Sequence, residues 1–116
     1  MNGLPTVLAR RTAHGGSELE IRVAQANPWF EGHFPGHPIL PGVAQIAWAV
    51  HYAAELCGSP PTPPDLEQVK FKRPILPGAQ LTLRLTRTAD SARLRYEYRD
   101  AEQSYSSGML DFRKRA

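Results

Sequence analysis

The stretch most suited to chemistry is the run 29–43, in which a lone histidine lies among prolines and glycines just before an apolar segment. Because proline fixes φ and glycine permits turns that other residues resist, this run predicts a rigid loop that holds His33. Pro41 suits the first turn of a helix, which leaves the Gly42 and Val43 N–H groups unpaired. A histidine near two free amides at the positive end of a helix can take a proton beside a thioester and stabilise the resulting enolate.

A buried helix is expected directly after this loop. The segment 43–57 is apolar at all positions except Gln45, His51 and Glu55. A helix that is apolar nearly all round must be buried on most sides. The proline cluster 59–64, which follows Gly58, predicts a stiff linker that leads away from the end of this helix.

Antiparallel strands are predicted on both sides of the helix. Apolar and polar residues alternate over three segments, as in strands with one buried face, and these segments are 18–23, 81–86 and 93–99. Weaker strand patterns cover 7–11, 66–72 and 104–112, and hairpin turns are expected at 14–17, 88–91 and 100–102. One long buried helix wrapped by a curved antiparallel sheet of about five to six strands is the α+β arrangement known as the hot-dog fold.

The composition is that of one soluble globular domain. The chain has 116 residues, of which 41% are hydrophobic and 22% charged, so a single domain over 1–116 is expected. One helix and one curved sheet make a small core, and the sheet leaves edges to cover, so two copies should pair as a homodimer or a multiple of one. A single cysteine and no clustered ligands argue against a disulfide within the chain and against a metal site.

Two motifs in this order resemble a known family. The run from His33 to Val43 matches the hallmark His-Phe-Pro-Gly-x-Pro-x-x-Pro-Gly-Val of the hot-dog-fold 3-hydroxyacyl-acyl carrier protein dehydratases, which precedes their central helix. The run from Val69 to Leu81 resembles the family's next strand pair, and the likeness spans roughly residues 5 to 113. A looser likeness, in Leu40 to Gln45 and Trp48, is to the small stand-alone dehydratases of aryl-polyene pigment pathways.

The resemblance implies an activity and roles for residues. It implies dehydration of 3-hydroxyacyl thioesters, carried by the phosphopantetheine of acyl carrier protein, to trans-2-enoyl thioesters, without a cofactor or metal. His33 would remove the C2 proton and the Gly42 N–H would stabilise the thioester oxygen. The residues expected to contact the substrate are Phe34, Pro41, Val43 and Trp48. Large aromatics such as Trp29, Phe30 and Trp48 have a second interpretation, since they also fill cores and dimer interfaces.

The sequence departs from the family at the expected proton donor. The family has a glutamate or aspartate five residues after the motif glycine, and a glutamine one helical turn later, whereas this chain has Ala47 and His51. Residues i and i+4 are neighbours on a helix, so Ala47, His51 and Glu55 form one stripe. Either His51 substitutes as proton donor with support from Glu55, or His51 is a satisfied buried polar group and Glu55 faces solvent. Ala47 fits a natural variant and an engineered replacement equally well.

Three functions follow from this pattern. The first is the dehydratase, with an activity impaired by Ala47. The second is a catalytically silent subunit that binds an acyl thioester or acyl carrier protein and completes a dimer with an active partner. The third is a hot-dog thioesterase, which also needs a carboxylate, and the sequence places none opposite His33.

Charge predicts an acidic partner. The net charge is +3 and the pI about 9.4, and a basic rim formed by Lys70, Lys72 and Arg73 would steer an acidic acyl carrier protein. Arginines that alternate along strands are alternatively a solvated face. No aromatic platform or recognised motif for nucleic acid accompanies the charge. The first residues do not resemble a signal peptide, and the longest apolar stretch is too short to cross a membrane, so a cytoplasmic location is expected.

Overall fold

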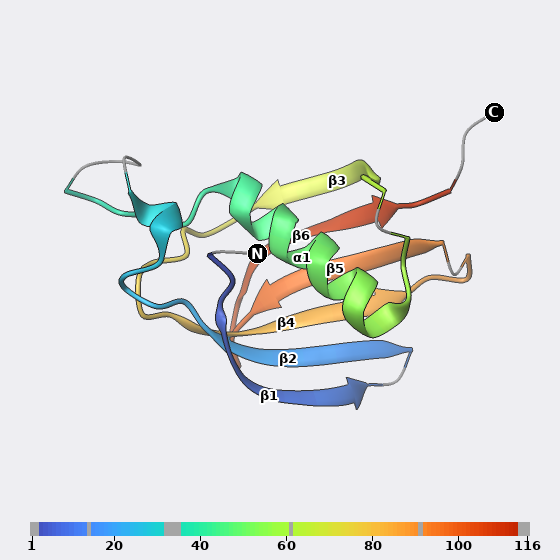
Figure 1. Cartoon of the computed structure of the whole chain (residues 1–116), viewed down its shortest axis with the longest axis horizontal. Coiled ribbons are helices and arrows are strands. Elements are labelled where there is room, and N and C mark those ends of the chain that lie inside the picture. Colours follow the sequence, from blue (N-terminus) through green and yellow to red (C-terminus); the bar gives the residue numbers. More distant parts are fainter. Residues whose placement is uncertain (1–2, 14, 32–35, 61, 91, 114–116) are drawn as a thin grey trace.

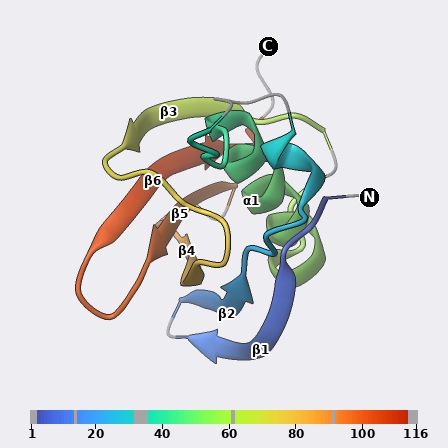
Figure 2. The ribbon, with the colours of Figure 1, turned by 90° about the vertical axis from the view of Figure 1, so that its left-hand side faces the viewer.

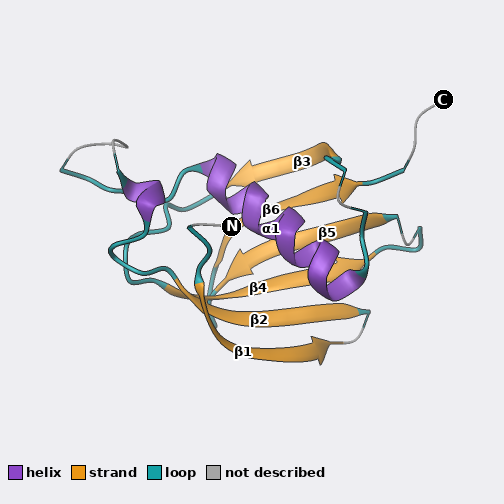
Figure 3. Cartoon of the chain, viewed as in Figure 1, coloured by secondary structure: helices purple, strands orange, loops and turns teal. Residues whose placement is uncertain are grey.

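The computed structural model describes residues 3–13, 15–31, 36–60, 62–90 and 92–113 (Figure 1). Six strands and one α-helix are formed within these residues (Figure 3). In chain order the elements are β1 (Thr6–Ala13), β2 (Gly16–Arg22), the 3-10 helix η1 (Pro28–Phe30), α1 (Gly42–Cys57), β3 (Asp65–Phe71), β4 (Gln80–Arg87), β5 (Arg93–Arg99) and β6 (Ser104–Asp111).

All strands join one antiparallel sheet in the order β1-β2-β4-β5-β6-β3. Figure 2 shows the sheet curving around α1, with β1 and β3 at its two edges. This arrangement confirms the predicted hot-dog fold. The expected turn at 14–17 is shorter than predicted, because Gly16 and Ser17 already pair with β4. Gly16 has no room for a side chain, since a Cβ there would lie 1.8 Å from the Leu85 carbonyl oxygen.

The helix is buried on one face only, so the prediction of burial on most sides is wrong for the single chain. Its inward residues are Ala44, Gln45, Trp48, Ala49, Tyr52 and Ala53. They pack on the leucines and tyrosines that alternate along β2, β4 and β5, as the period-two pattern predicted. Trp48 is fully buried and its Nε1 donates to the Gly3 carbonyl oxygen at 2.9 Å. This supports the core-filling interpretation of Trp48, and Trp29 and Phe30 likewise pack against the core.

Two neighbouring buried tyrosines of β5 differ in their hydrogen bonding. The Tyr98 hydroxyl donates to the backbone carbonyl oxygen of Gln45 at 2.6 Å and so ties α1 to the sheet. The Tyr96 hydroxyl is buried with no hydrogen-bond partner among the described residues. Burial raises the pKa of Tyr96 to about 12 and raises that of Tyr98 well above its usual value, because the interior disfavours a phenolate.

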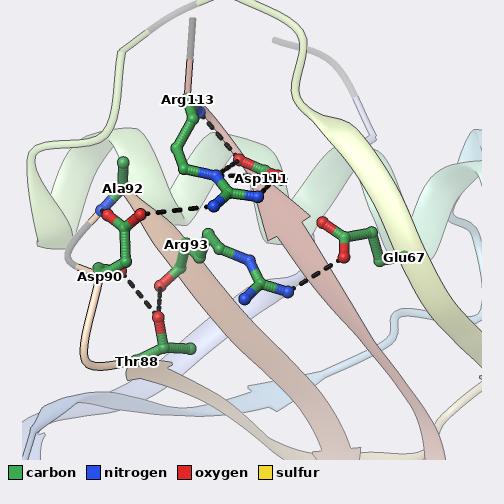
Figure 4. A network of polar contacts seen from close by, with 7 residues as sticks. All are labelled: Glu67, Thr88, Asp90, Ala92, Arg93, Asp111 and Arg113. Atoms are coloured by element: carbon green, nitrogen blue, oxygen red, sulfur yellow. Dashed lines mark hydrogen bonds and ion pairs between the residues drawn. The ribbon is translucent and has the colours of Figure 1, made fainter. Parts of the chain in front are cut away.

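An ion pair joins the edge strand β3 to β5, and further ion pairs lie at the end of β6 (Figure 4). Arg93 of β5 donates to the Glu67 carboxylate of β3 at 3.0 Å. Asp111, at the end of β6, is paired with Arg113 at 2.7 Å, and this guanidinium holds the pKa of the Asp111 carboxyl well below its usual range. Arg113 also lies 3.7 Å from Asp90. A bulge follows Glu67 in the pairing of β3 with β6, and Gln68 has a φ of 53° there.

We predict opposite effects for the two tyrosine-to-phenylalanine changes. Tyr98→Phe should lower the free energy of unfolding by about 1–3 kcal/mol, because it leaves a buried carbonyl with one donor fewer. Tyr96→Phe should leave this free energy unchanged or raise it, because it removes a hydroxyl that is already unpaired. Urea unfolding followed by tryptophan fluorescence measures both. Equal losses for the two variants would contradict the hydrogen bonding described above.

We also predict a pH dependence that comes from Arg113. A carboxyl whose folded pKa is lowered contributes stability above its unfolded pKa of about 3.9, and this is lost as the pH falls toward the folded value. Arg113→Gln should therefore lower the urea midpoint of unfolding most at pH 7. The difference in midpoint between this variant and the unmodified chain should become smaller below about pH 4. Arg95→Gln is the control, because Arg95 has no ion pair within the described residues. A difference for Arg113→Gln that stays constant down to pH 2 would contradict the assignment.

Candidate active site

The first turn of α1 presents two free amides, as predicted. Pro41 precedes the helix with extended backbone angles, and its carbonyl oxygen accepts from the Ala44 and Gln45 N–H groups. The Gly42 and Val43 N–H groups make no hydrogen bond within the described residues. The Phe71 ring lies directly against Gly42, since a Cβ at that position would be 2.6 Å from the ring's Cζ. A side chain at position 42 would therefore require the Phe71 ring to move.

The predicted base and one predicted contact residue, His33 and Phe34, lie outside the described residues. The segment that leads to them is well anchored by Asn27, a buried residue at the start of η1. The Asn27 side chain accepts from the Trp29 N–H at 3.0 Å and donates to the Gly3 carbonyl oxygen at 3.0 Å. Trp48 donates to the same Gly3 oxygen, so this segment and α1 share one anchor.

An apolar groove runs along the outward face of α1, beside β3. It has a volume of about 530 Å³ and is lined by Ile46, Ala47, Val50, His51, Ala54, Pro63, Pro64 and Leu66. The helix residues among them follow the i, i+4 spacing of one face. The linker prolines and Leu66 of β3 form the opposite wall. Ala47, at the position where an acid was expected, is thus one of the residues that line the groove. His51 is the only titratable side chain among these lining residues.

His51 lies at the end of a short chain of polar contacts. Its Nε2 lies 3.3 Å from Glu55 Oε2, and Glu55 also accepts from Arg10 of β1. The Arg10 guanidinium, together with His51, holds the pKa of the Glu55 carboxyl below its usual range. The predicted stripe of Ala47, His51 and Glu55 is therefore present. Glu55 is partly exposed, as the second interpretation expected, but it is paired with Arg10 and His51. The His51 side chain is 32% exposed, so the expectation that His51 is a buried polar group is wrong.

The predicted basic rim divides into two parts. Lys72 and Arg73 are exposed beside a small hollow at the N-terminus of α1, which is lined also by Pro41, Gly42 and Phe71. Lys70 is exposed on β3 itself. Arginines of the outer sheet face mostly pair with carboxylates instead: Arg84 pairs with Glu18, and Arg93 with Glu67. The solvated-face interpretation therefore describes those strand arginines.

Sequence reasoning missed two residues of this region. Phe71 covers Gly42 and is more than half exposed, and its signal was a large aromatic at the end of an edge strand. Gln45 is buried beneath the same turn, and its signal was an amide in an otherwise apolar helix face. Among the described residues, no cluster of three or more His, Cys, Asp or Glu side chains is arranged to hold a metal ion. No helix in the described part of the chain is long and apolar enough to span a membrane.

Comparisons with known proteins agree with this geometry. The family model described as ApeI-like, ApeI dehydratase, matches residues 9–109. A 3-hydroxyacyl-[acyl-carrier-protein] dehydratase FabZ of Geobacter metallireducens is 40% identical over 70 residues, which are 53% of this chain and 47% of that protein. The FabZ of Polynucleobacter necessarius is 34% identical over 95 residues, 76% of this chain and 62% of that protein. The chain spans about half the length of the first of these relatives.

Solved structures share this fold. The dehydratase heterocomplex ApeI:P from Xenorhabdus doucetiae contains a chain that superposes with a TM-score of 0.80 at 33% identity, covering 92% of this chain and 96% of that one. The dehydratase domain of a mycocerosic acid synthase-like polyketide synthase has a TM-score of 0.73 at 14% identity, with 100% of this chain and 42% of that one covered, which shows the shared fold alone. Because the family model matches most of the chain, residues 9–109, the chain belongs to the ApeI-like dehydratase family.

Proposed function

We propose that this chain takes part in the dehydration of 3-hydroxyacyl thioesters, carried by acyl carrier protein, to trans-2-enoyl thioesters in fatty-acid or aryl-polyene type biosynthesis in the cytoplasm. The observation that carries the proposal is the apolar groove on the outward face of α1, which is lined by helix residues from Ile46 to Ala54 and begins about one turn beyond the free amides of Gly42 and Val43. An apolar groove of this kind suits the hydrocarbon part of an acyl thioester. Family relatives named as dehydratases of this type support the assignment.

The roles of the residues follow from the chemistry. His33 takes the C2 proton while the thioester oxygen accepts a hydrogen bond from the Gly42 N–H, which disperses the enolate charge. The C3–O bond then breaks, and the leaving hydroxyl needs one proton to depart as water. Pro41 and Val43 contact the thioester end of the substrate, and Val43 is 67% exposed for such contact. A thioesterase would need a carboxylate in the groove, and none lines it among the described residues.

The missing proton donor favours a second candidate, a subunit that binds the acyl thioester or acyl carrier protein without catalysing the reaction alone. The groove is open, β3 is an unpaired sheet edge, and Leu66 and Phe71 expose large apolar surface beside it. A second hot-dog chain covering this face would bury it. A second copy, forming a homodimer, brings His51 but no acid at position 47. A different chain with a carboxylate there would complete one site, and the solved ApeI:P structure is a complex of two kinds of chain.

Ala47→Glu tests the first candidate. Proton transfer by a positioned side chain contributes about 10² to 10⁴-fold to rate, so this variant should dehydrate 3-hydroxyacyl carrier-protein substrates faster than the unmodified chain by that order. Enoyl absorbance measures the rate, and light scattering on the same samples reports the assembly. Ala54→Glu is the matched control, since it places the same carboxylate in the same groove about two turns away and should not gain activity.

Other results of this assay separate the remaining possibilities. If the unmodified chain is already fully active, His51→Gln should abolish that activity and identify His51 as the donor. If no Ala47 variant gains activity on any acyl length while the chain still binds acyl carrier protein, the binding-subunit function is correct.

Reversing two charges tests the partner. Lys72→Glu together with Arg73→Glu should weaken binding of acyl carrier protein and make the remaining affinity less dependent on salt, because both side chains are exposed beside the turn that carries Gly42. Turnover of short pantetheine thioesters, which lack the protein, should change little. Arg95→Glu, the same charge change on an exposed position of β5, should have no effect on binding. Equal losses with both kinds of substrate would argue against this docking face.

A further inference from the structure

Gln45 is the most buried polar residue of α1, with 4% of its surface exposed. Both ends of its amide are used: Nε2 donates to the Leu40 carbonyl oxygen at 3.2 Å, and Oε1 accepts from the Ser106 hydroxyl of β6 at 2.6 Å. An amide removed from water costs free energy unless it is hydrogen-bonded, and here both ends of the Gln45 amide are bonded. The two bonds fix the direction of this amide between Leu40 and β6.

The partner of Gln45 is the residue that leads into the free-amide turn. The Leu40 N–H donates to the Ile75 carbonyl oxygen at 2.8 Å, and the Leu40 carbonyl accepts from Gln45, so this residue is held on both sides. Only Pro41, whose φ is restricted by its ring, separates Leu40 from Gly42. On the other side the Phe71 ring lies against Gly42. Few degrees of freedom remain for the direction of the Gly42 N–H bond.

We propose that Gln45 is a positioning residue, which aims the Gly42 N–H at the thioester oxygen by holding the Leu40 carbonyl against β6. The inference rests on the proposed function for the identity of the ligand, a pantetheine thioester. It assigns to Ser106 the role of orienting the Gln45 amide so that its NH₂ group faces Leu40. A donor aimed before the substrate binds stabilises developing charge without reorganising at the moment of reaction.

The test compares variants that remove different hydrogen bonds of Gln45. Gln45→Met keeps the length of the side chain and removes both bonds of its amide. Ser106→Ala removes only the hydroxyl that orients it. Tyr98→Phe is the matched control, because it removes a bond to the Gln45 backbone oxygen and leaves the Leu40 contact in place. All three should lower stability, so stability alone does not distinguish positioning from packing.

The distinguishing measurement is the infrared carbonyl band of bound butyryl-pantetheine labelled with ¹³C at the thioester carbon, a saturated probe that the chain cannot dehydrate. A hydrogen bond from Gly42 lowers this frequency. We expect the lowering in the unmodified chain and in Tyr98→Phe, and its loss in Gln45→Met, with a smaller lowering in Ser106→Ala. Turnover should follow the same order, with kcat of Gln45→Met reduced by about 10 to 10²-fold and KM little changed, because removal of a whole oxyanion donor costs about 10² to 10³-fold.

Each outcome decides the inference. If Gln45→Met keeps the lowered frequency, or Tyr98→Phe loses it equally, Gln45 has only a structural role. If the bound probe shows no lowering in the unmodified chain, Gly42 is not a donor and the inference is wrong. If the lowering follows the predicted order but no 3-hydroxyacyl substrate is dehydrated, the positioning role stands and the proposed dehydration fails.

Discussion

The seating of α1 on the inner face of the curved sheet is the interaction on which the rest of this structure depends. Trp48 and its alanine neighbours fill the space above the leucines of β2 and β4, and small residues let the helix approach the sheet closely. Three buried polar contacts add direction to this apolar packing: Trp48 to Gly3, Tyr98 to Gln45, and Gln45 to Ser106. Apolar burial stabilises the two layers, and the hydrogen bonds attach α1 to the N-terminal segment and to β5 and β6.

A helix packed in this way has one face that the sheet does not cover, and the groove lies on that face. Its wall residues are small or branched apolar side chains, and its second wall comes from a linker and an edge strand instead of from the sheet interior. The ion pair of Glu67 with Arg93 links that edge strand to β5, although its hydrogen-bonded neighbour in the sheet is β6 alone (Figure 4). The site is therefore built at the boundary of the fold, where a second chain can complete it.

The carboxylate that the family resemblance leads us to expect on α1 is absent, because position 47 is alanine. Loss of water from a 3-hydroxyacyl group needs a base for C2 and an acid for the hydroxyl. With Ala47 the groove wall is apolar at that point, and the titratable side chain in the same lining is His51, which contacts Glu55, itself paired with Arg10. The chemistry of this chain thus depends on whether the donor comes from His51, from a partner, or from neither.

The sequence by itself determined the features that depend on local order. The alternation along β2, β4 and β5, the helix after Pro41, the free amides at Gly42 and the absence of an acid at position 47 all follow from residue types and spacing. The motif at 33–43 was sufficient for the family, because few unrelated loops combine those prolines and glycines with one histidine.

Only the tertiary structure decided which face of α1 stays uncovered, since an apolar pattern does not say what lies against each side. The same holds for Trp48 as a core residue, for Glu55 paired with Arg10, and for the amide of Gln45 between Leu40 and Ser106. Each of the two polar contacts, Arg10 with Glu55 and Ser106 with Gln45, joins residues far apart in the chain. Periodicity carries no information about such pairs, because they form where the curvature of the sheet brings distant elements together.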